Sequence, residues 1–360
     1  FKYDATHCAV ADGIRDSGGI AALYQRAYEG LSSPEVATGA DISFGFAPGN
    51  AELDRQSGSE IQYHVSTGYI GDHRFPLLRE QAVKVRAQLQ ENGATHIVGY
   101  LDENSTGDSR WVIGHHVPQR DYGFWLEKVL AEPWFGLLIK PKVPRGLRER
   151  LGPVAELLRM AEDTGRCIVY EQRSETSFNG WYPPAAVALA SDVAVHGDLA
   201  AATAGMEAAL AGSPTLLYDG QGCPLSPLHR LGDDSVVFQD WDTLWEACRN
   251  HWSAPGSVPG FGDWSAMLDE LDPFRDGRAA ERIGTYVHWL IQGLQAGRSR
   301  EDVMSETAQR YCDIWGSDKI NEVRNGKLGA KDAPGGKQNI QEPLVNRLAF
   351  SPVTSKRNGL

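Results

Sequence analysis

The sequence predicts an α/β fold in which helices cover both faces of a parallel sheet. Between residues 95 and 252, apolar runs of strand length alternate with segments of helical periodicity, which is typical of doubly wound parallel sheets. Within the segment 191–219, two apolar runs flank an Ala-rich helix, so a complete strand–helix–strand unit is visible. The 360 residues are 41% hydrophobic, and no apolar run approaches the ~20 residues that a membrane span needs. We therefore expect a soluble globular chain of two domains.

Each element of this region can be placed from its own pattern. Strands are expected at residues 95–101, 136–140, 167–170, 192–195, 215–218 and 236–238. Helices are expected at residues 122–130, 147–164, from 183 onward, near 203 and at 241–252. Gly165 follows the periodicity of the second helix, where a C-terminal cap is expected. Together these elements make one complete Rossmann-like domain.

The rest of the chain offers fewer elements. Helices are expected at residues 11–30 and 75–92, and strands at 41–46 and 60–65, too few for a second complete Rossmann-like domain. We expect a partial N-terminal domain, a Rossmann-like domain, C-terminal helices and a flexible or tag-like tail, at residues 1–94, 95–275, 276–326 and 327–360. Because the chain begins at Phe1 rather than Met, we also expect a processed or trimmed form of a longer protein.

Charge and cysteine content argue against a nucleic-acid-binding protein and against a structural zinc site. The net charge of −12 argues against binding a nucleic-acid backbone as the main task, because such proteins gather Lys and Arg on one face. The five cysteines are odd in number and share no short metal-type spacing. We expect reduced thiols and no structural zinc.

The amino end of the Ala-rich helix is the first candidate binding site. Small residues from Ala200 to Gly205 would let the first backbone amides approach a ligand closely, and these amides and the helix dipole favour an anion. Thr203 adds a hydroxyl, and Glu207 lies four residues further on the same face, placed to accept hydrogen bonds from a sugar diol. The alternative is a helix that packs tightly in the sheet, with Glu207 as a solvated acid.

This segment resembles the donor-binding helix of nucleotide-sugar glycosyltransferases of the GT-B fold, especially bacterial enzymes that build capsule and other surface polysaccharides. The residues that carry the resemblance are Thr203, Gly205, Glu207, Ala208, Gly212 and Pro214. The resemblance implies that Thr203 and Gly205 face the donor phosphates and that Glu207 faces the ribose. It covers residues 90–320, and it implies that residues 1–94 are a partial acceptor domain braced by the C-terminal helices.

Three loops should converge with this helix, because ligands of open α/β sheets bind beyond the carboxyl ends of the strands. The loop 101–116 offers Asp102 and Asn104, and the strand 192–195 is followed by His196, which could donate to a phosphate or move a proton. Lys140-Pro141-Lys142 resembles the basic turn of capsule-type transferases, and two lysines would neutralise a diphosphate without a metal. The alternatives are a hydrated loop, a hydrogen-bonded structural histidine and a solvated basic turn.

A general base is expected in the first domain. Inverting transfer needs a carboxylate or an imidazole to deprotonate the acceptor hydroxyl, and the run 64–74 concentrates such groups after a predicted strand. Asp72 or His73 are the candidates, with Asp72 as the N-cap of the following helix as the alternative. Asn50, Glu52 and Arg55 are candidates for contacts with an acceptor sugar.

The predicted function is transfer of a sugar from a nucleotide-sugar donor to a glycan or lipid-linked glycan acceptor in surface polysaccharide biosynthesis. We expect a cytoplasmic, metal-independent bacterial enzyme with no cofactor beyond its donor substrate. A peripheral association with the inner membrane or with a polysaccharide assembly complex stays open. So do two alternatives, a nucleotide-sugar epimerase of the same fold and a non-catalytic nucleotide-sugar-binding scaffold.

Overall fold

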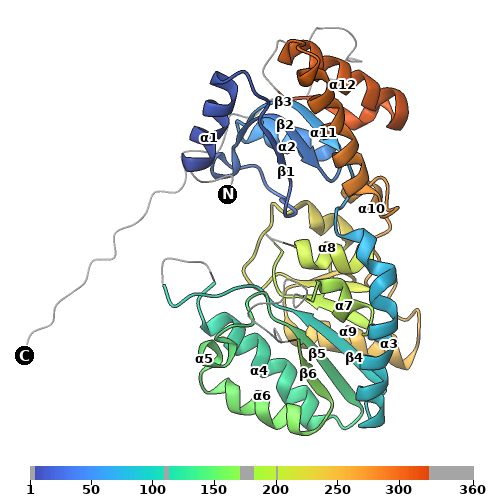
Figure 1. Cartoon of the computed structure of the whole chain (residues 1–360). Helices are drawn as coiled ribbons and strands as arrows, with labels where there is room; N and C mark the ends of the chain where they lie inside the picture. Colours follow the sequence, from blue (N-terminus) through green and yellow to red (C-terminus); the bar gives the residue numbers. More distant parts are fainter. Residues whose placement is uncertain (1–4, 109–112, 171–181, 200–201, 324–360) are drawn as a thin grey trace, which may run out of the picture. The chain divides into compact units, whose positions relative to one another are not determined.

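The computed structural model describes residues 5–108, 113–170, 182–199 and 202–323 (Figure 1). The predicted tail from residue 327 lies outside these ranges, as do Ala200 and Ala201 of the small-residue turn. The described strands form two separate sheets, one of four strands and one of six. None of the helices in the described residues has the length and apolarity that crossing a membrane requires.

The larger sheet consists of six parallel strands from the middle of the sequence. They are β4 (His96–Leu101), β5 (Phe135–Lys140), β6 (Cys167–Val169), β7 (Val193–His196), β8 (Thr215–Tyr218) and β9 (Val237–Phe238). Their order across the sheet is β6-β5-β4-β7-β8-β9, with every neighbouring pair parallel. Counted from β4, this is the order 3-2-1-4-5-6 of a Rossmann fold. The predicted α/β class with one complete Rossmann-like domain is confirmed.

Helices cover both faces of this sheet. The described helices that pack on it are α3 (Phe75–Glu91), α4 (His116–Ala131), α5 (Leu147–Leu151), α6 (Val154–Asp163), α7 (Pro184–Ala188), α8 (Thr203–Leu210) and α9 (Trp241–Ser253). On one face, Trp125 of α4 and Trp245 of α9 pack against Phe135 of β5. On the other face, Leu89 of α3 and Ala208 of α8 belong to a second buried cluster. This burial of apolar area on both faces explains the nearly continuous apolar runs of the strands.

The smaller sheet joins strands from the two ends of the described chain. It contains β1 (Ala22–Tyr24), β2 (Gly39–Gly45), β3 (Glu60–Ser66) and β10 (Ile320–Glu322) in that order. β1, β2 and β3 are parallel, and β10 pairs with β3 in the antiparallel direction. β10 was not expected from the sequence. Two further helices, α1 (Ala5–Asp16) and α2 (Gly49–Gln56), belong to this N-terminal region.

The C-terminal helices α11 (Ala279–Gln295) and α12 (Arg300–Trp315) pack on one face of the smaller sheet, after the short α10 (Leu268–Leu271) (Figure 1). Phe44 and Val65 of the sheet share a buried cluster with Tyr286 of α11 and Tyr311 of α12. The hydroxyl of Tyr311 also donates to the carbonyl of Ser66 at 2.8 Å. These helices therefore return to the N-terminal sheet, as predicted for bracing helices.

Two helix predictions are wrong, in both cases because a glycine ends the helix early. The helix expected over residues 11–30 is α1 followed by β1, since Gly18 has a φ of +76° and the chain then pairs with β2. The helix expected over 147–164 is divided into α5 and α6. Gly152 has a φ of +53° there, and Pro153 is the N-cap of α6.

Candidate functional site

The strand order places a topological switch point between β4 and β7. In open α/β sheets, ligands bind beyond the carboxyl ends of the strands at this point. β4 ends at Leu101 and β7 ends at His196, and these two residues are register partners. The polar residues that follow both strands, including Asp102 and Glu103, therefore lie at one edge of the sheet. We call this edge the β4–β7 edge.

His196 is the most constrained side chain at the β4–β7 edge. It is completely buried, and its Nδ1 lies 2.9 Å from the carbonyl oxygen of Leu101, so Nδ1 carries the proton of this hydrogen bond. Its Nε2 lies 3.8 Å from a carboxylate oxygen of Glu103 and has no hydrogen-bond partner among the described residues. An unsatisfied buried polar atom is costly and calls for an explanation. In the neutral ring Nε2 is therefore an acceptor, and a ligand hydroxyl could supply its partner; in the cationic ring Nε2 is a donor, and a phosphate oxygen could.

Asp102 holds the loop after β5 against the end of β4. Its carboxylate accepts a hydrogen bond from the hydroxyl of Tyr122 at 2.7 Å and another from the backbone amide of Lys142. Burial raises the pKa of Asp102 to about 6. Because both carboxylate oxygens have protein partners, Asp102 positions the Lys142 loop in this structure. Asn104, the other candidate on this loop, is exposed.

The two lysines of the predicted basic turn reach the same edge. The ammonium of Lys142 bonds the carboxylate of Glu103, which also approaches His196. Lys140 donates to the carbonyl of Pro141 at 3.1 Å, and burial lowers its pKa while nearby carboxylates oppose that shift. The structure thus brings Asp102, Lys140, Lys142 and His196 to one edge of the sheet. Lys142 is exposed, as the alternative of a solvated turn has it, and the Nδ1 bond of His196 is the one expected of a hydrogen-bonded structural histidine.

The amino end of α8 carries no side-chain cap, since its N-cap residue is Ala202. The first amides of a helix have no partner within the helix, so an uncapped end can bind an anion. The hydroxyl of Thr203 accepts a hydrogen bond from the amide of Tyr28 at 2.8 Å and keeps its own proton to donate.

Gly205 is explained by packing within the sheet. A Cβ at this position would come within 2.9 Å of Leu217 Cδ2 and 3.4 Å of His196 Cβ. Only a glycine lets α8 lie this close to β7 and β8. The contact also holds the ring of His196 beside α8, so the two candidate features of the site adjoin each other. The tight-packing explanation from the sequence therefore applies at Gly205, and its predicted contact with phosphate stays a prediction.

Glu207 is buried, so the alternative of a solvated acid is wrong. Its carboxylate accepts hydrogen bonds from the amide of Ala185 at 3.0 Å and from the hydroxyl of Tyr69. Burial raises the pKa of Glu207. Each oxygen already has one protein partner, so a ribose hydroxyl would bond a remaining lone pair or replace Tyr69. Tyr69 is the residue that sequence analysis missed; an aromatic residue within a Gly-rich loop was the available signal.

The candidate base residues lie in the loop after β3. Asp72 and His73 belong to a short 3-10 helix, η2 (Asp72–Arg74). One carboxylate oxygen of Asp72 accepts from the amide of Gly277 at 2.8 Å, and burial raises its pKa. The alternative role of Asp72 as N-cap of α3 is wrong, because Arg74 occupies the N-cap position. His73 is exposed, with its Nδ1 2.8 Å from the carbonyl of Ile70.

No protein-family model matches the sequence, and no curated protein matches it. Among solved structures, HepE from Anabaena in complex with UDP and glucose is similar at 14% identity and a TM-score of 0.41, covering 68% of this chain and 63% of that one. The wall teichoic acid polymerase TagF is similar at 12% identity and a TM-score of 0.45, and the match covers 74% of this chain and 58% of TagF. A protein described as a UDP-N-acetylglucosamine 2-epimerase from Listeria monocytogenes is similar at 14% identity and a TM-score of 0.49. The match covers 82% of this chain and 74% of that one.

The chain spans less than two thirds of the length of HepE and of TagF. Identities of 12–14% and TM-scores below 0.5 say nothing of the activity of this chain.

Proposed function

We propose that this chain is a GT-B-like glycosyltransferase that binds a nucleotide sugar at the β4–β7 edge and transfers the sugar to a glycan or lipid-linked glycan acceptor. The observation that carries the proposal is His196, whose buried Nε2 has no partner among the described residues at the switch point. The uncapped amino end of α8 adjoins it. The helix end suits a phosphate group of a nucleotide, and Nε2 donates to a phosphate oxygen in the cationic ring, in which both nitrogens carry a proton.

Glu103 acts as a stand-in for the ligand phosphate. Its carboxylate bonds the ammonium of Lys142 and lies 3.8 Å from Nε2 of His196. A phosphate oxygen bound by the same two groups would occupy this place. Entry of the nucleotide would therefore displace Glu103 and transfer Lys142 from the carboxylate to the phosphate, an exchange of one anion for another.

The same groups would stabilise the leaving group. As the bond to the sugar breaks, negative charge develops on the diphosphate, and fixed donors around it lower the barrier. Lys140, Lys142 and His196 supply cationic or donor groups there, and Thr203 and Glu207 are proposed to contact phosphate and ribose. Asp72 or His73 would take the proton of the acceptor hydroxyl. We propose transfer without a metal, and activity lost in EDTA would contradict it.

The setting that we propose is surface polysaccharide biosynthesis in the bacterial cytoplasm, at the cytoplasmic face of the membrane. The resemblance of the α8 segment to capsule-type transferases supports it. Radiolabelled nucleotide sugar incubated with membrane lipid extracts tests it, because a lipid-linked product is expected. Product found only on added soluble glycans would exclude the lipid-linked acceptor.

A nucleotide-sugar epimerase is the second candidate, and the neighbouring carboxyl groups of Asp102 and Glu103 at the β4–β7 edge favour it, because an epimerase of this fold would use paired carboxylates. Burial raises the pKa of Asp102 to about 6, and proton transfer by it would require that Tyr122 or Lys142 release the carboxylate. An epimerase needs no acceptor. Product analysis after incubation with the nucleotide sugar alone therefore separates the two: an isomerised sugar indicates an epimerase, and an unchanged donor that reacts once an acceptor is added indicates a transferase.

Ligand-induced stabilisation tests donor binding. A ligand that binds only the folded state raises the melting temperature, so the protein is heated with UDP, GDP, CMP, CDP or dTDP. We expect one of these to raise it, and we expect the rise to shrink in Lys142→Ala. Lys84→Ala is the matched control, since Lys84 lies exposed on α3. A panel without any stabilising nucleotide, or a rise unchanged in Lys142→Ala, would contradict the proposed site.

A further inference from the structure

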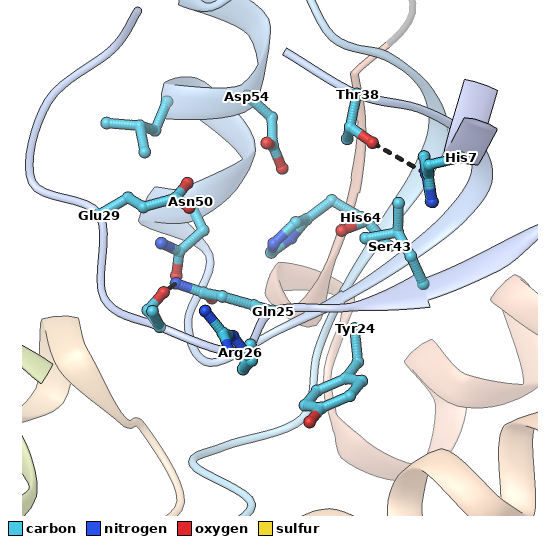
Figure 2. Close-up of a pocket in the computed structure, with 13 residues that line it drawn as sticks. His7, Tyr24, Gln25, Arg26, Glu29, Thr38, Ser43, Asn50, Asp54 and His64 are labelled. Carbon is cyan, nitrogen blue, oxygen red and sulfur yellow. Dashed lines mark hydrogen bonds between the residues drawn. The ribbon is translucent and has the colours of Figure 1, made fainter. Parts of the chain in front are cut away.

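A cavity lies on the face of the smaller sheet opposite α11 and α12. Its volume is about 380 Å³, within the range of small-molecule sites. Leu23, Ser43 and His64 are register partners on β1, β2 and β3, and all three line it. Asn50 and Leu53 of α2 also line it, and Figure 2 shows Asn50 among the residues around the cavity. The cavity belongs to the N-terminal sheet, whereas the β4–β7 edge belongs to the other sheet.

His64 is an unusual residue at the base of this cavity. It is completely buried, and neither ring nitrogen has a hydrogen-bond partner among the described residues. Figure 2 shows its ring and the carboxylate of Asp54 pointing into the same space. Asn321 of β10 is the register partner of His64, and its Nδ2 also lacks a partner within the described part of the chain. Asn321 itself is half-buried and does not line the cavity, but its buried Nδ2 beside the His64 ring adds a second polar atom without a partner, which points to a missing hydrogen-bonding group.

The charge of the cavity disfavours an anionic ligand. Its wall carries one guanidinium, from Arg26, and two carboxylates, from Glu29 and Asp54. Burial lowers the pKa of His64 to about 4, so the imidazole is neutral at pH 7 and offers one donor and one acceptor. A nucleotide or a sugar phosphate would meet a wall with net negative charge. An uncharged ligand with several hydroxyl groups avoids this repulsion and can bond the donors and acceptors of the wall, such as the imidazole of His64 and the amide of Asn50.

The apolar groups on the wall define the shape of the ligand. Leu23 lies in the same row of register partners as Ser43 and His64, and Leu53 of α2 also lines the cavity. A pyranose ring presents C–H groups on its faces and hydroxyl groups around its edge, so it matches apolar side chains beside polar ones. Solvent does not reach the His64 ring in this structure, and its Nε2 lies against Gly45, so a ligand contacts the ring only after neighbouring groups move.

We propose that this cavity is a binding site for an uncharged saccharide unit, with His64 at its base hydrogen-bonded to a sugar hydroxyl. The site is separate from the proposed donor site and deepens the proposed function on which it rests, because Asn50 on its wall is one of the residues expected to contact an acceptor sugar. A saccharide supplies the hydrogen-bonding partner that His64 lacks, and Asn50 lies on the wall to contact the same ring.

Saturation-transfer NMR with the full chain tests the proposal. The probes are the methyl glycosides of glucose, galactose and N-acetylglucosamine, with putrescine as the probe for a cationic ligand. We expect at least one glycoside to bind. In His64→Leu and in Asn50→Ala the affinity should fall by at least about tenfold. Leu77→Ala, a change at an exposed leucine of α3, should leave it unchanged.

Thermal unfolding of the ligand-free His64→Leu variant gives a second readout. Leucine removes two unpartnered polar atoms and keeps an apolar side chain, so the melting temperature should not fall; a clear fall would show that the imidazole already has partners and would overturn the proposal. Three binding outcomes also overturn it: no glycoside binds, glycoside binding persists in both cavity variants, or putrescine alone binds. Nucleotide binding by the cavity variants should match that of the wild type, which separates this site from the donor site.

Discussion

The hydroxyl of Tyr69 donates a hydrogen bond to the carboxylate of Glu207, across 138 positions of the sequence. Tyr69 follows β3 of the smaller sheet and Glu207 lies on α8 of the larger one, and both are buried. The bond therefore connects the loop that holds the candidate base to the helix that holds the candidate donor site. It is one of the two hydrogen bonds that the buried carboxylate of Glu207 accepts, the other coming from the amide of Ala185.

Removing that donor should destabilise the protein. Tyr69→Phe leaves one buried oxygen of Glu207 without its partner, at a cost of about 1–3 kcal/mol in the free energy of unfolding. Urea denaturation measures this cost. Tyr24→Phe is the control, because Tyr24 is 50% exposed. Equal stability of the two variants would show that the bond contributes nothing.

Asp102 should make stability depend on pH. Burial raises its pKa from 3.8 to about 6, so between these values the folded protein binds more protons than the unfolded chain does. The free energy of unfolding should therefore fall as the pH rises from about 4 to about 6, by up to about 3 kcal/mol, and stay level above that window.

The variant Asp102→Asn isolates this contribution, because asparagine does not titrate. The difference in unfolding free energy between the variant and the wild type should shift in favour of the variant across the same window. It is measured by urea denaturation at a series of pH values. A difference that is constant with pH would mean that Asp102 is ionised throughout.

Glu103→Gln should tighten the binding of a nucleoside diphosphate. The variant removes the negative charge that now bonds Lys142 and approaches His196, so the phosphate no longer competes with a carboxylate. We expect a gain of about 1 kcal/mol, or about fivefold in Kd, by titration calorimetry. Glu91→Gln, at an exposed position of α3, serves as the control. Weaker binding in Glu103→Gln would show that Glu103 contacts the ligand favourably.

Gly205→Ala should be destabilising and Gly284→Ala stabilising, although both glycines are helical. A Cβ at Gly205 would meet Leu217 at 2.9 Å, whereas a Cβ at Gly284 of α11 meets nothing within 4 Å. We expect a loss of about 1–3 kcal/mol at Gly205 and a gain of up to about 1 kcal/mol at Gly284. The melting temperatures of the two variants, compared with that of the wild type, measure both effects. A stabilised Gly205→Ala would show that α8 can move away from the sheet.

Patterns of local residues predicted the larger sheet well, because each of its strands is buried on both faces and reads as an apolar run. Because the strand ends could be located, Asp102, Lys140 and His196 could be placed at or next to the carboxyl ends of parallel strands. Such ends lie at one edge of the sheet, so the convergence of these residues was predictable. β10 is only three residues long and pairs with a strand more than 250 positions away, so no local signal marks it. The burial of Glu207 was equally hidden, because its partner Tyr69 is distant in sequence.

The most direct test of the central claim is a crystal structure of the protein with whichever nucleoside diphosphate raises its melting temperature. The account predicts phosphate oxygens bonded to Nε2 of His196 and to the first amides of α8, with Glu103 moved away from Lys142. A diphosphate bound elsewhere, with His196 and Glu103 as they are in the ligand-free structure, would contradict it.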